Sequence, residues 1–188
     1  RLQPASSSAR AKPIIQRNFN SMTLPNFMDA NPNADALSIV VMAAGKGTRM
    51  KSALPKVLHP LASRSLLHHV LVTTSGLGAS LTAVITGHEA AQVEAATAGM
   101  EGVRCGRQEA QLGTWHAVQQ ALPLLPDAGT TLILNGDVPL IEAATARALA
   151  AACGGAKLAL LTIELLDATG YGRIVRNDKQ EVRAIVEH

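Results

Sequence analysis

Hydrophobic positions from residue 38 onward form short runs that alternate with longer stretches in which apolar residues recur at helical spacing. The runs are β-branched or leucine-rich, have the length of strands, and in several cases are bounded by Gly, Pro or Asp. We therefore predict strands at SIVVMAA (38–44), LTAVIT (81–86), VRC (103–105), TTLILN (130–135) and KLALLTIEL (157–165).

The stretches between these runs predict helices. They cover residues 63–76, 88–99, 112–125 and 141–154, and Gly76, Gly99 and Gly154 stand where a helix would end. Strands and helices that alternate in this way predict an α/β fold of Rossmann-like type, with a mostly parallel sheet and helices on both faces. Ligands of such sheets bind outside the carboxyl ends of the strands.

Both ends of the chain depart from this alternation. Residues 1–36 are rich in Ser, Pro and Asn, so we expect a disordered or loosely ordered extension that is dispensable for folding and ligand binding. The first 28 residues are basic and contain no acid, and a transit peptide is the alternative interpretation. At the other end, GRIVR and VRAIVE flank the turn NDKQ and predict two further strands.

The composition suits one folded domain, here residues 37–188, whose core consists mostly of Leu, Val, Ile and Ala, since 47% of residues are hydrophobic and 2% are aromatic. The net charge is +3, but the positive charge is local. No acid stands between Asp35 and Glu89, where the basic residues are Lys46, Arg49, Lys51, Lys56 and Arg64. This bias favours a small phosphate ligand over nucleic acid, because a long basic stripe and aromatic residues for base stacking are lacking.

The two cysteines, Cys105 and Cys153, lie far apart and have no spacing typical of a metal site. We interpret them as ordinary thiols of a reducing compartment. The sequence has no apolar run of the eighteen or so residues that a membrane span needs, and no segment that resembles a signal peptide. We therefore expect a cytoplasmic protein without a membrane partner.

The glycine segment AAGKGTRMKS (43–52) follows the first predicted strand. It is not a Walker loop, which needs GxxxxGK[ST]. It is not a dinucleotide fingerprint either, because Met50 stands where the third glycine belongs and no acid follows about twenty residues later. Two interpretations stay open on the residues alone: a plain turn with solvated lysines, or a loop whose backbone N–H groups hold phosphates.

Four motifs along the chain support the second interpretation, because they resemble the motifs of one enzyme family and occur in the same order as in that family. AAGKGTRM followed by LPKVLH resembles the signature of the sugar-1-phosphate nucleotidyltransferases, and in particular of the N-acetylglucosamine-1-phosphate uridyltransferases. The further segments with this resemblance are RQEAQLGTWHAV (107–118), LILNGDVPLI (132–141), and TGYGRIVR (169–176) with IVEH (185–188).

The resemblance implies transfer of a uridylyl group from UTP to N-acetylglucosamine 1-phosphate with Mg²⁺, which yields pyrophosphate and a precursor of peptidoglycan and lipopolysaccharide. Such a reaction needs no protein nucleophile, so catalysis consists of positioning and charge neutralisation. Two alternatives stay open: a nucleotidyltransferase for another sugar 1-phosphate, and a nucleotide-binding module that cannot turn over.

The resemblance also implies a set of site residues. The nucleotide would contact Ala43, Ala44, Gly45, Gly47, Thr48, Gln108, Gly113 and Thr114. Arg49 and Lys56 would neutralise the phosphates, Asp137 would bind the metal, and Gly172 and Glu187 would contact the sugar. Trp115 stands where the family has a small residue, and whether it crowds the uracil pocket or packs outward stays open.

The family's uridyltransferase domain continues beyond the VEH motif with more sheet and an asparagine that completes the metal site. We therefore expect this domain to be incomplete on its carboxyl-terminal side. Neither an acetyltransferase domain nor self-association can be predicted from these residues.

Overall fold

A computed structural model describes residues 36–47, 50–154, 157–179 and 181–186 of the chain. These residues fall into two compact units, the first ending at Ala159 and the second beginning at Leu160. The expected amino-terminal extension lies outside the described residues, apart from Ala36.

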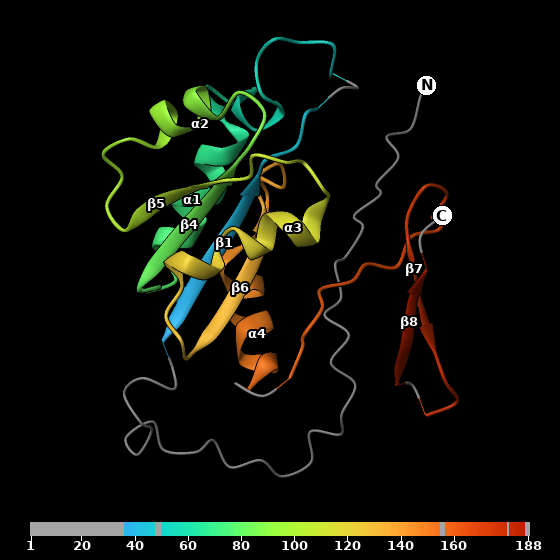
Figure 1. Cartoon of the computed structure of the whole chain (residues 1–188). Coiled ribbons are helices and arrows are strands. Elements are labelled where there is room, and N and C mark those ends of the chain that lie inside the picture. Colours follow the sequence, from blue (N-terminus) through green and yellow to red (C-terminus); the bar gives the residue numbers. More distant parts are fainter. Residues whose placement is uncertain (1–35, 48–49, 155–156, 180, 187–188) are drawn as a thin grey trace, which may run out of the picture. The chain divides into compact units, whose positions relative to one another are not determined.

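The first unit is built on a parallel sheet with strand order β5-β4-β1-β6 (Figure 1). Its strands are β1 (Leu37–Ala43), β4 (Leu81–Thr86), β5 (Val103–Arg107) and β6 (Thr130–Asn135). All of their pairings are parallel, and Val41 at the centre of β1 lies opposite Val84 of β4 and Leu134 of β6. The prediction of a mostly parallel sheet is therefore confirmed, and β5 extends two residues beyond the predicted end.

In the described residues of this unit, α1 (Leu66–Ser75), α2 (Ala90–Thr97) and α3 (Thr114–Gln119) connect these strands, and α4 (Ala143–Cys153) follows β6. Ser65 is the N-cap of α1, and its hydroxyl accepts a hydrogen bond from the backbone N–H of His68 at 3.1 Å. Gly76 and Gly154 are the C-caps of α1 and α4, as the sequence predicts. Short elements complete the unit: η2 (Lys56–Leu58), β2 (Pro60–Leu61), β3 (Arg64–Ser65) and η3 (Leu122–Leu124).

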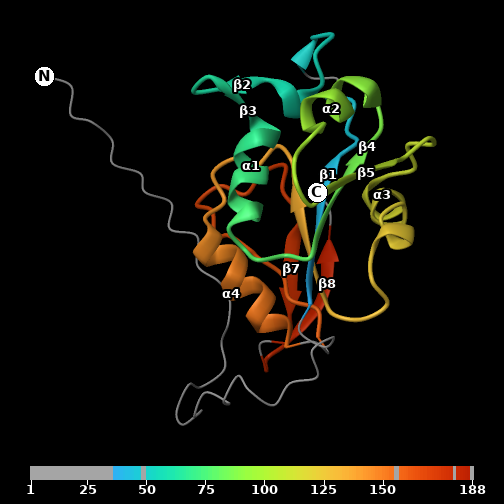
Figure 2. The ribbon, with the colours of Figure 1, turned by 90° about the vertical axis from the view of Figure 1, so that its left-hand side faces the viewer.

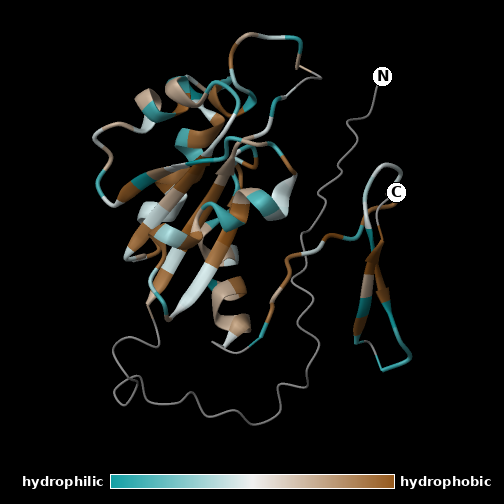
Figure 3. Ribbon diagram, in the orientation of Figure 1, coloured by the Kyte–Doolittle hydropathy of each residue, from teal (hydrophilic) through white to brown (hydrophobic). Residues whose placement is uncertain are grey.

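Strand β1 is buried on both faces because helices cover the sheet on both sides (Figure 2). One core contains Ile39 and Val41 with residues of α1, α2 and α4. The opposite core contains Val40 with Ala117 of α3. Alternate side chains of one strand thus enter different cores, which requires the unbroken hydrophobic run seen in the central strands (Figure 3).

Two sequence predictions were wrong. Residues 157–165 do not form a strand, and Leu158 is 86% exposed. An apolar run becomes a strand only where a neighbouring strand accepts its backbone hydrogen bonds, and no ladder in the described part of the chain includes this run. The helix predicted over 112–125 covers Thr114–Gln119 alone, and a 3-10 turn follows because Pro123 has no N–H for an α-helical bond.

The second unit contains β7 (Arg173–Arg176) and β8 (Val182–Val186), which form the predicted antiparallel pair. Ile174 lies opposite Ile185, and a β-bulge falls between Val175 and Arg176. The turn between the strands is held in part by Asn177, whose side-chain oxygen accepts hydrogen bonds from the backbone N–H groups of Lys179 and Glu181.

Cys105 and Cys153 are both free thiols, as expected. No helix in the described residues has the length and apolar character needed to cross a membrane.

Truncation of Leu67 tests the core on the α1 side of the sheet. Leu67 is 1% exposed, so Leu67→Ala should lower the free energy of unfolding by about 2–5 kcal/mol. Val72 lies on the same helix, is 50% exposed and serves as the control. Val72→Ala should change the free energy of unfolding by less than about 0.5 kcal/mol. Urea denaturation measures both variants, and similar losses would contradict this assignment of buried and exposed faces.

Candidate active site

The chain order places a crevice at the carboxyl end of β1. From β1 the chain proceeds to β4 and then to β5 on one side, and it returns to place β6 on the other side of β1. The strand order therefore reverses at β1, and parallel sheets bind ligands outside the carboxyl ends of the strands at such a point. Gly45 follows β1 and Asp137 follows β6 at this edge.

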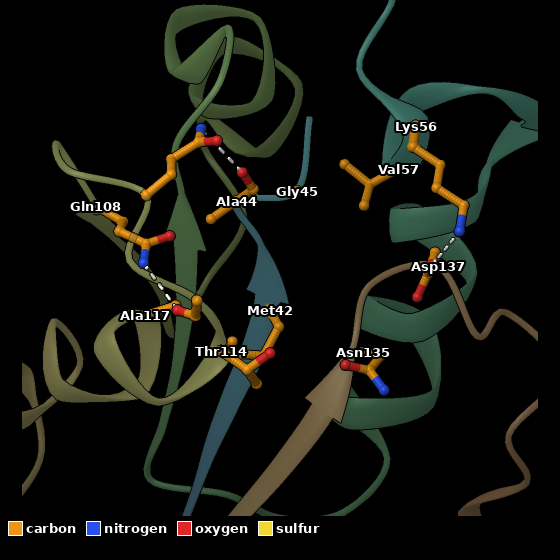
Figure 4. Close-up of a pocket in the computed structure, with 12 residues that line it drawn as sticks. Met42, Ala44, Gly45, Lys56, Val57, Gln108, Thr114, Ala117, Asn135 and Asp137 are labelled. Carbon is orange, nitrogen blue, oxygen red and sulfur yellow. Dashed lines mark hydrogen bonds and ion pairs between the residues drawn. The ribbon is translucent and has the colours of Figure 1, made fainter. Parts of the chain in front are cut away.

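A pocket of about 320 Å³ lies at this crevice (Figure 4). It is lined by the carboxyl ends of β1 and β6, by the loops after β1, β5 and β6, and by η2 and α3: Met42, Ala44, Gly45, Lys56, Val57, Gln108, Gln111, Gly113, Thr114, Ala117, Asn135 and Asp137. The pocket thus joins segments that are far apart in the sequence.

Most of the predicted site residues in the first unit line this pocket. Ala43 does not, because it is 2% exposed and packs in the core on the α1 side. Gly47 lies against Lys56 rather than in the lining. Thr48, Arg49 and Glu187 lie outside the described residues.

Gly172, predicted to contact the sugar, belongs to the second unit and directly precedes β7. Trp115, the residue next to Thr114, is 72% exposed and is not among the pocket-lining residues.

Sequence reasoning missed several lining residues, among them Gln111 and Asn135. The Gln111 side chain donates a hydrogen bond to the backbone carbonyl of Ala44 at 3.3 Å, and so ties the loop after β5 to the end of β1. Gln111 could have been found from the sequence, because it stands three residues after Gln108 in the QEAQ segment. Asn135 was also detectable, as a polar residue at the carboxyl end of an apolar strand.

Gln108 is held rigidly at one end of the pocket. The residue is 5% exposed, and its backbone N–H donates to the carbonyl of Thr86 at 2.8 Å. Its side-chain Nε2 donates to the carbonyl of Gly113 at 3.0 Å and lies 3.0 Å from Nδ1 of His116. Because a carbonyl can only accept, the amide nitrogen faces Gly113 and leaves the amide oxygen as an acceptor for a ligand.

Lys56 and Asp137 form an ion pair at the opposite end, with 2.6 Å between Nζ and Oδ2 (Figure 4). Lys56 begins η2, and the backbone N–H of Leu58 donates to the carbonyl of Pro55 at 2.8 Å. Asp137 is positioned by Gly136, whose N–H donates to the carbonyl of Met42 at 2.9 Å. The side chains are 45% and 31% exposed, so both charges are accessible to a ligand.

The residues of this end suit a hard cation. Mg²⁺ is bound through one or two carboxylates together with substrate phosphates and water. The Asp137 carboxylate and the Asn135 amide oxygen offer such a partial set. No cluster of three or more His, Cys, Asp or Glu residues that could hold a metal occurs among the described residues.

A charged network supports the strand that precedes Gln108. Arg107 donates two hydrogen bonds to Glu94 of α2, from Nε to Oε1 at 2.6 Å and from an Nη to Oε2 at 2.7 Å. Buried Thr86 donates to the same carboxylate at 3.3 Å. The hydrogen bond from Arg107 lowers the pKa of Glu94, and the carboxylate raises the pKa of Arg107. The network joins α2 to the ends of β4 and β5.

A family model described as MobA-like NTP transferase domain matches residues 39–167, which include every residue of the pocket. The chain belongs to the MobA-like NTP transferase domain family.

The curated relatives of this NTP transferase chain include several proteins described as bifunctional protein GlmU, two of which follow. The protein from Methylibium petroleiphilum is 64% identical over 158 residues, and the match covers 81% of this chain and 34% of that protein. The protein from Polaromonas naphthalenivorans is 60% identical over 161 residues, with the same two shares. The chain thus spans about a third of the length of these relatives.

Solved structures agree with this membership. A nucleotidyl transferase from Methanothermobacter is similar with a TM-score of 0.57 and 28% identity, over 62% of this chain and 57% of that one. Rv0371c from Mycobacterium tuberculosis, solved as a complex with manganese, is similar with a TM-score of 0.53 and 27% identity. The match covers 64% of this chain and 60% of that one. The Rossmann-like α/β fold predicted from the sequence is confirmed, and it is the fold of the nucleotide-diphospho-sugar transferases.

A substitution at Gly47 tests whether the loop after β1 packs against Lys56. Its φ is +57°, and an added Cβ would lie 2.9 Å from Cβ of Lys56, so Gly47→Ala should lower the free energy of unfolding by about 1–3 kcal/mol. Gly45→Ala is the matched control, because a Cβ there has no atom within 4 Å. Chemical denaturation compares the two variants, and equal losses would refute the proposed close approach.

Glu94 should contribute to stability in a pH-dependent way. Because Arg107 lowers the pKa of Glu94 below 4.5 in the folded chain, its contribution is present above about pH 4.5 and is lost as the pH falls through the lower value. Glu94→Gln should cost at most about 1 kcal/mol at pH 7, because the pair is partly exposed.

Unfolding free energies of both proteins between pH 7 and pH 3 measure this contribution. The difference should shrink with acid, whereas Glu101→Gln, at an exposed position, should show a small difference at every pH. A difference that stays constant for Glu94→Gln would rule out the proposed effect.

Proposed function

We propose that this chain carries out uridylyl transfer from UTP to N-acetylglucosamine 1-phosphate, with release of pyrophosphate. The observation that carries the proposal is the pocket at the carboxyl edge of the sheet, where an amide suited to a base and a Lys56–Asp137 pair suited to phosphates and a metal face one cavity. The similarity to GlmU proteins supports this choice among nucleotidyltransferases. The matches cover 34% of the length of these GlmU proteins, so the proposal concerns that part of their length.

The nucleotide base would bind at the Gln108 end. The free amide oxygen of Gln108 can accept a hydrogen bond from N3–H of uracil, a donor that cytosine lacks at that position. Gly113 and Thr114 would contact the other side of the base. Ala44 and Gly45, with Ala43 behind them, would let the base and ribose approach the backbone closely.

The triphosphate would bind toward Lys56. The backbone of Gly47 and Thr48 would face the phosphates, Arg49 would bind the leaving pyrophosphate, and Lys56 would neutralise the α-phosphate as charge increases in the transition state. The attacking oxygen belongs to the sugar phosphate, so the protein need only align it with the α-phosphorus.

A divalent cation would be held by Asp137 together with substrate phosphates. The manganese complex of the neighbour Rv0371c supports dependence on a divalent metal, and we propose Mg²⁺. When bound, such a cation would neutralise charge on the phosphates. Asp137 and Asn135 are the residues of this chain available to it.

The sugar would be recognised by Gly172 and Glu187. A carboxylate can accept hydrogen bonds from two sugar hydroxyls, and glycine leaves room for the acetamido group. The product would serve synthesis of peptidoglycan and lipopolysaccharide, and we propose a cytoplasmic location, without nucleic-acid or membrane partners.

Pyrophosphate release from UTP and N-acetylglucosamine 1-phosphate in the presence of Mg²⁺ tests the proposed function. Asp137→Ala should lower the rate by about a hundredfold or more, because it removes the carboxylate that faces the phosphates. Asp127→Ala removes the same charge from an exposed position outside the pocket and should leave the rate unchanged.

UTP binding should be measured by calorimetry in parallel. Binding without turnover would mean that these residues form a nucleotide-binding module only. Faster reaction with another sugar 1-phosphate would replace the proposed acceptor, and equal rates for Asp137→Ala and the original chain would refute the role of Asp137.

A further inference from the structure

Lys56 and Asp137 bind each other through an ion pair. The proposed function, on which this inference rests, assigns Lys56 to the nucleotide phosphates and Asp137 to the metal. In the structure, Nζ of Lys56 lies 2.6 Å from Oδ2 of Asp137. An ammonium group at that distance occupies one of the two carboxylate oxygens, and it neutralises the charge that would attract a cation to either oxygen.

The two partners differ in their freedom to move. Asp137 has a short side chain, and the preceding Gly136 is enclosed: a Cβ there would lie 3.0 Å from the Met42 carbonyl and 3.3 Å from Cγ1 of Val57. Lys56 has a long side chain that is 45% exposed, while its Cβ packs against Gly47. The lysine side chain is the longer and more exposed of the two, so we assign the separation of the pair to a movement of Lys56.

We propose that Lys56 is a nucleotide-responsive gate on Asp137: it covers the carboxylate until a triphosphate draws the ammonium group away and leaves the carboxylate free for the divalent cation. A triphosphate competes well for Lys56 because it carries several negative charges, whereas Asp137 carries one. An exposed ion pair is weak, so its separation costs little. The nucleotide and the metal then bind cooperatively, and each raises the affinity for the other by the same factor.

Direct contact between the metal and the triphosphate would also make their binding cooperative. Only the gate predicts that Lys56 changes the metal affinity of the chain without nucleotide. Without nucleotide, Lys56 competes with the metal, so Lys56→Met should bind a divalent cation more tightly than the original chain. The expected gain is about fivefold, the size expected from the loss of an exposed ion pair. The increase in metal affinity that UTP causes should be smaller in Lys56→Met than in the original chain.

Mn²⁺ binding to the full chain, followed by electron paramagnetic resonance of the free ion, measures this effect with and without UTP. Lys46→Met is the matched control, because it removes the same charge from an exposed residue of the same loop that does not line the pocket. Lys56→Gln repeats the test with a polar side chain. The double variant Lys56→Met and Asp137→Asn should not bind Mn²⁺ more tightly than the original chain, because an amide is a weaker metal ligand than the Asp137 carboxylate.

The outcomes separate the gate from the proposed function. UTP binding is followed independently by the fluorescence of Trp115, the single tryptophan, which adjoins the pocket residue Thr114. A chain that binds no UTP overturns the proposed function and the gate with it. A chain that binds UTP, but whose Mn²⁺ affinity is the same in Lys56→Met and Lys46→Met, overturns the gate alone.

Discussion

The burial of β1 on both faces and both edges is the constraint on which the rest of the first unit depends. Ile39, Val40 and Val41 have no exposed surface, and parallel strands flank β1 on both sides. A central parallel strand needs crossover connections, and the helices of those connections supply the two cores that enclose it. The same geometry brings the loops after β1 and β6 to one edge, so the pocket is a consequence of how β1 is buried.

The two ends of the pocket have different physical characters. The Gln108 end is rigid: the side chain is buried, its nitrogen is already engaged, and its strand is tied to α2 through Arg107 and Glu94. Such a site can select one base, because a mismatched partner would leave the amide oxygen unsatisfied. The Lys56–Asp137 end is exposed and is held by one ion pair, so it can rearrange around ligands.

This division suits the chemistry proposed for a nucleotidyltransferase. Discrimination between bases requires fixed hydrogen-bond partners, whereas neutralisation of a triphosphate requires charges that can move to meet it. The glycine loop serves the second requirement, because Gly47 permits the backbone to pass close to Lys56. The fold thus supplies fixed recognition on the α3 side of β1 and adjustable charge on the η2 side.

The sequence by itself determined the strands with unbroken apolar runs, the glycines that end helices, and most of the residues that line the pocket, because these depend on local composition and short motifs. It wrongly predicted a strand at 157–165, since pairing requires a neighbouring edge that composition does not reveal. Only the tertiary structure decided that Lys56 meets Asp137, 81 residues away, and that Arg107 meets Glu94. Contacts between distant residues follow from strand order and helix packing, which no local pattern specifies.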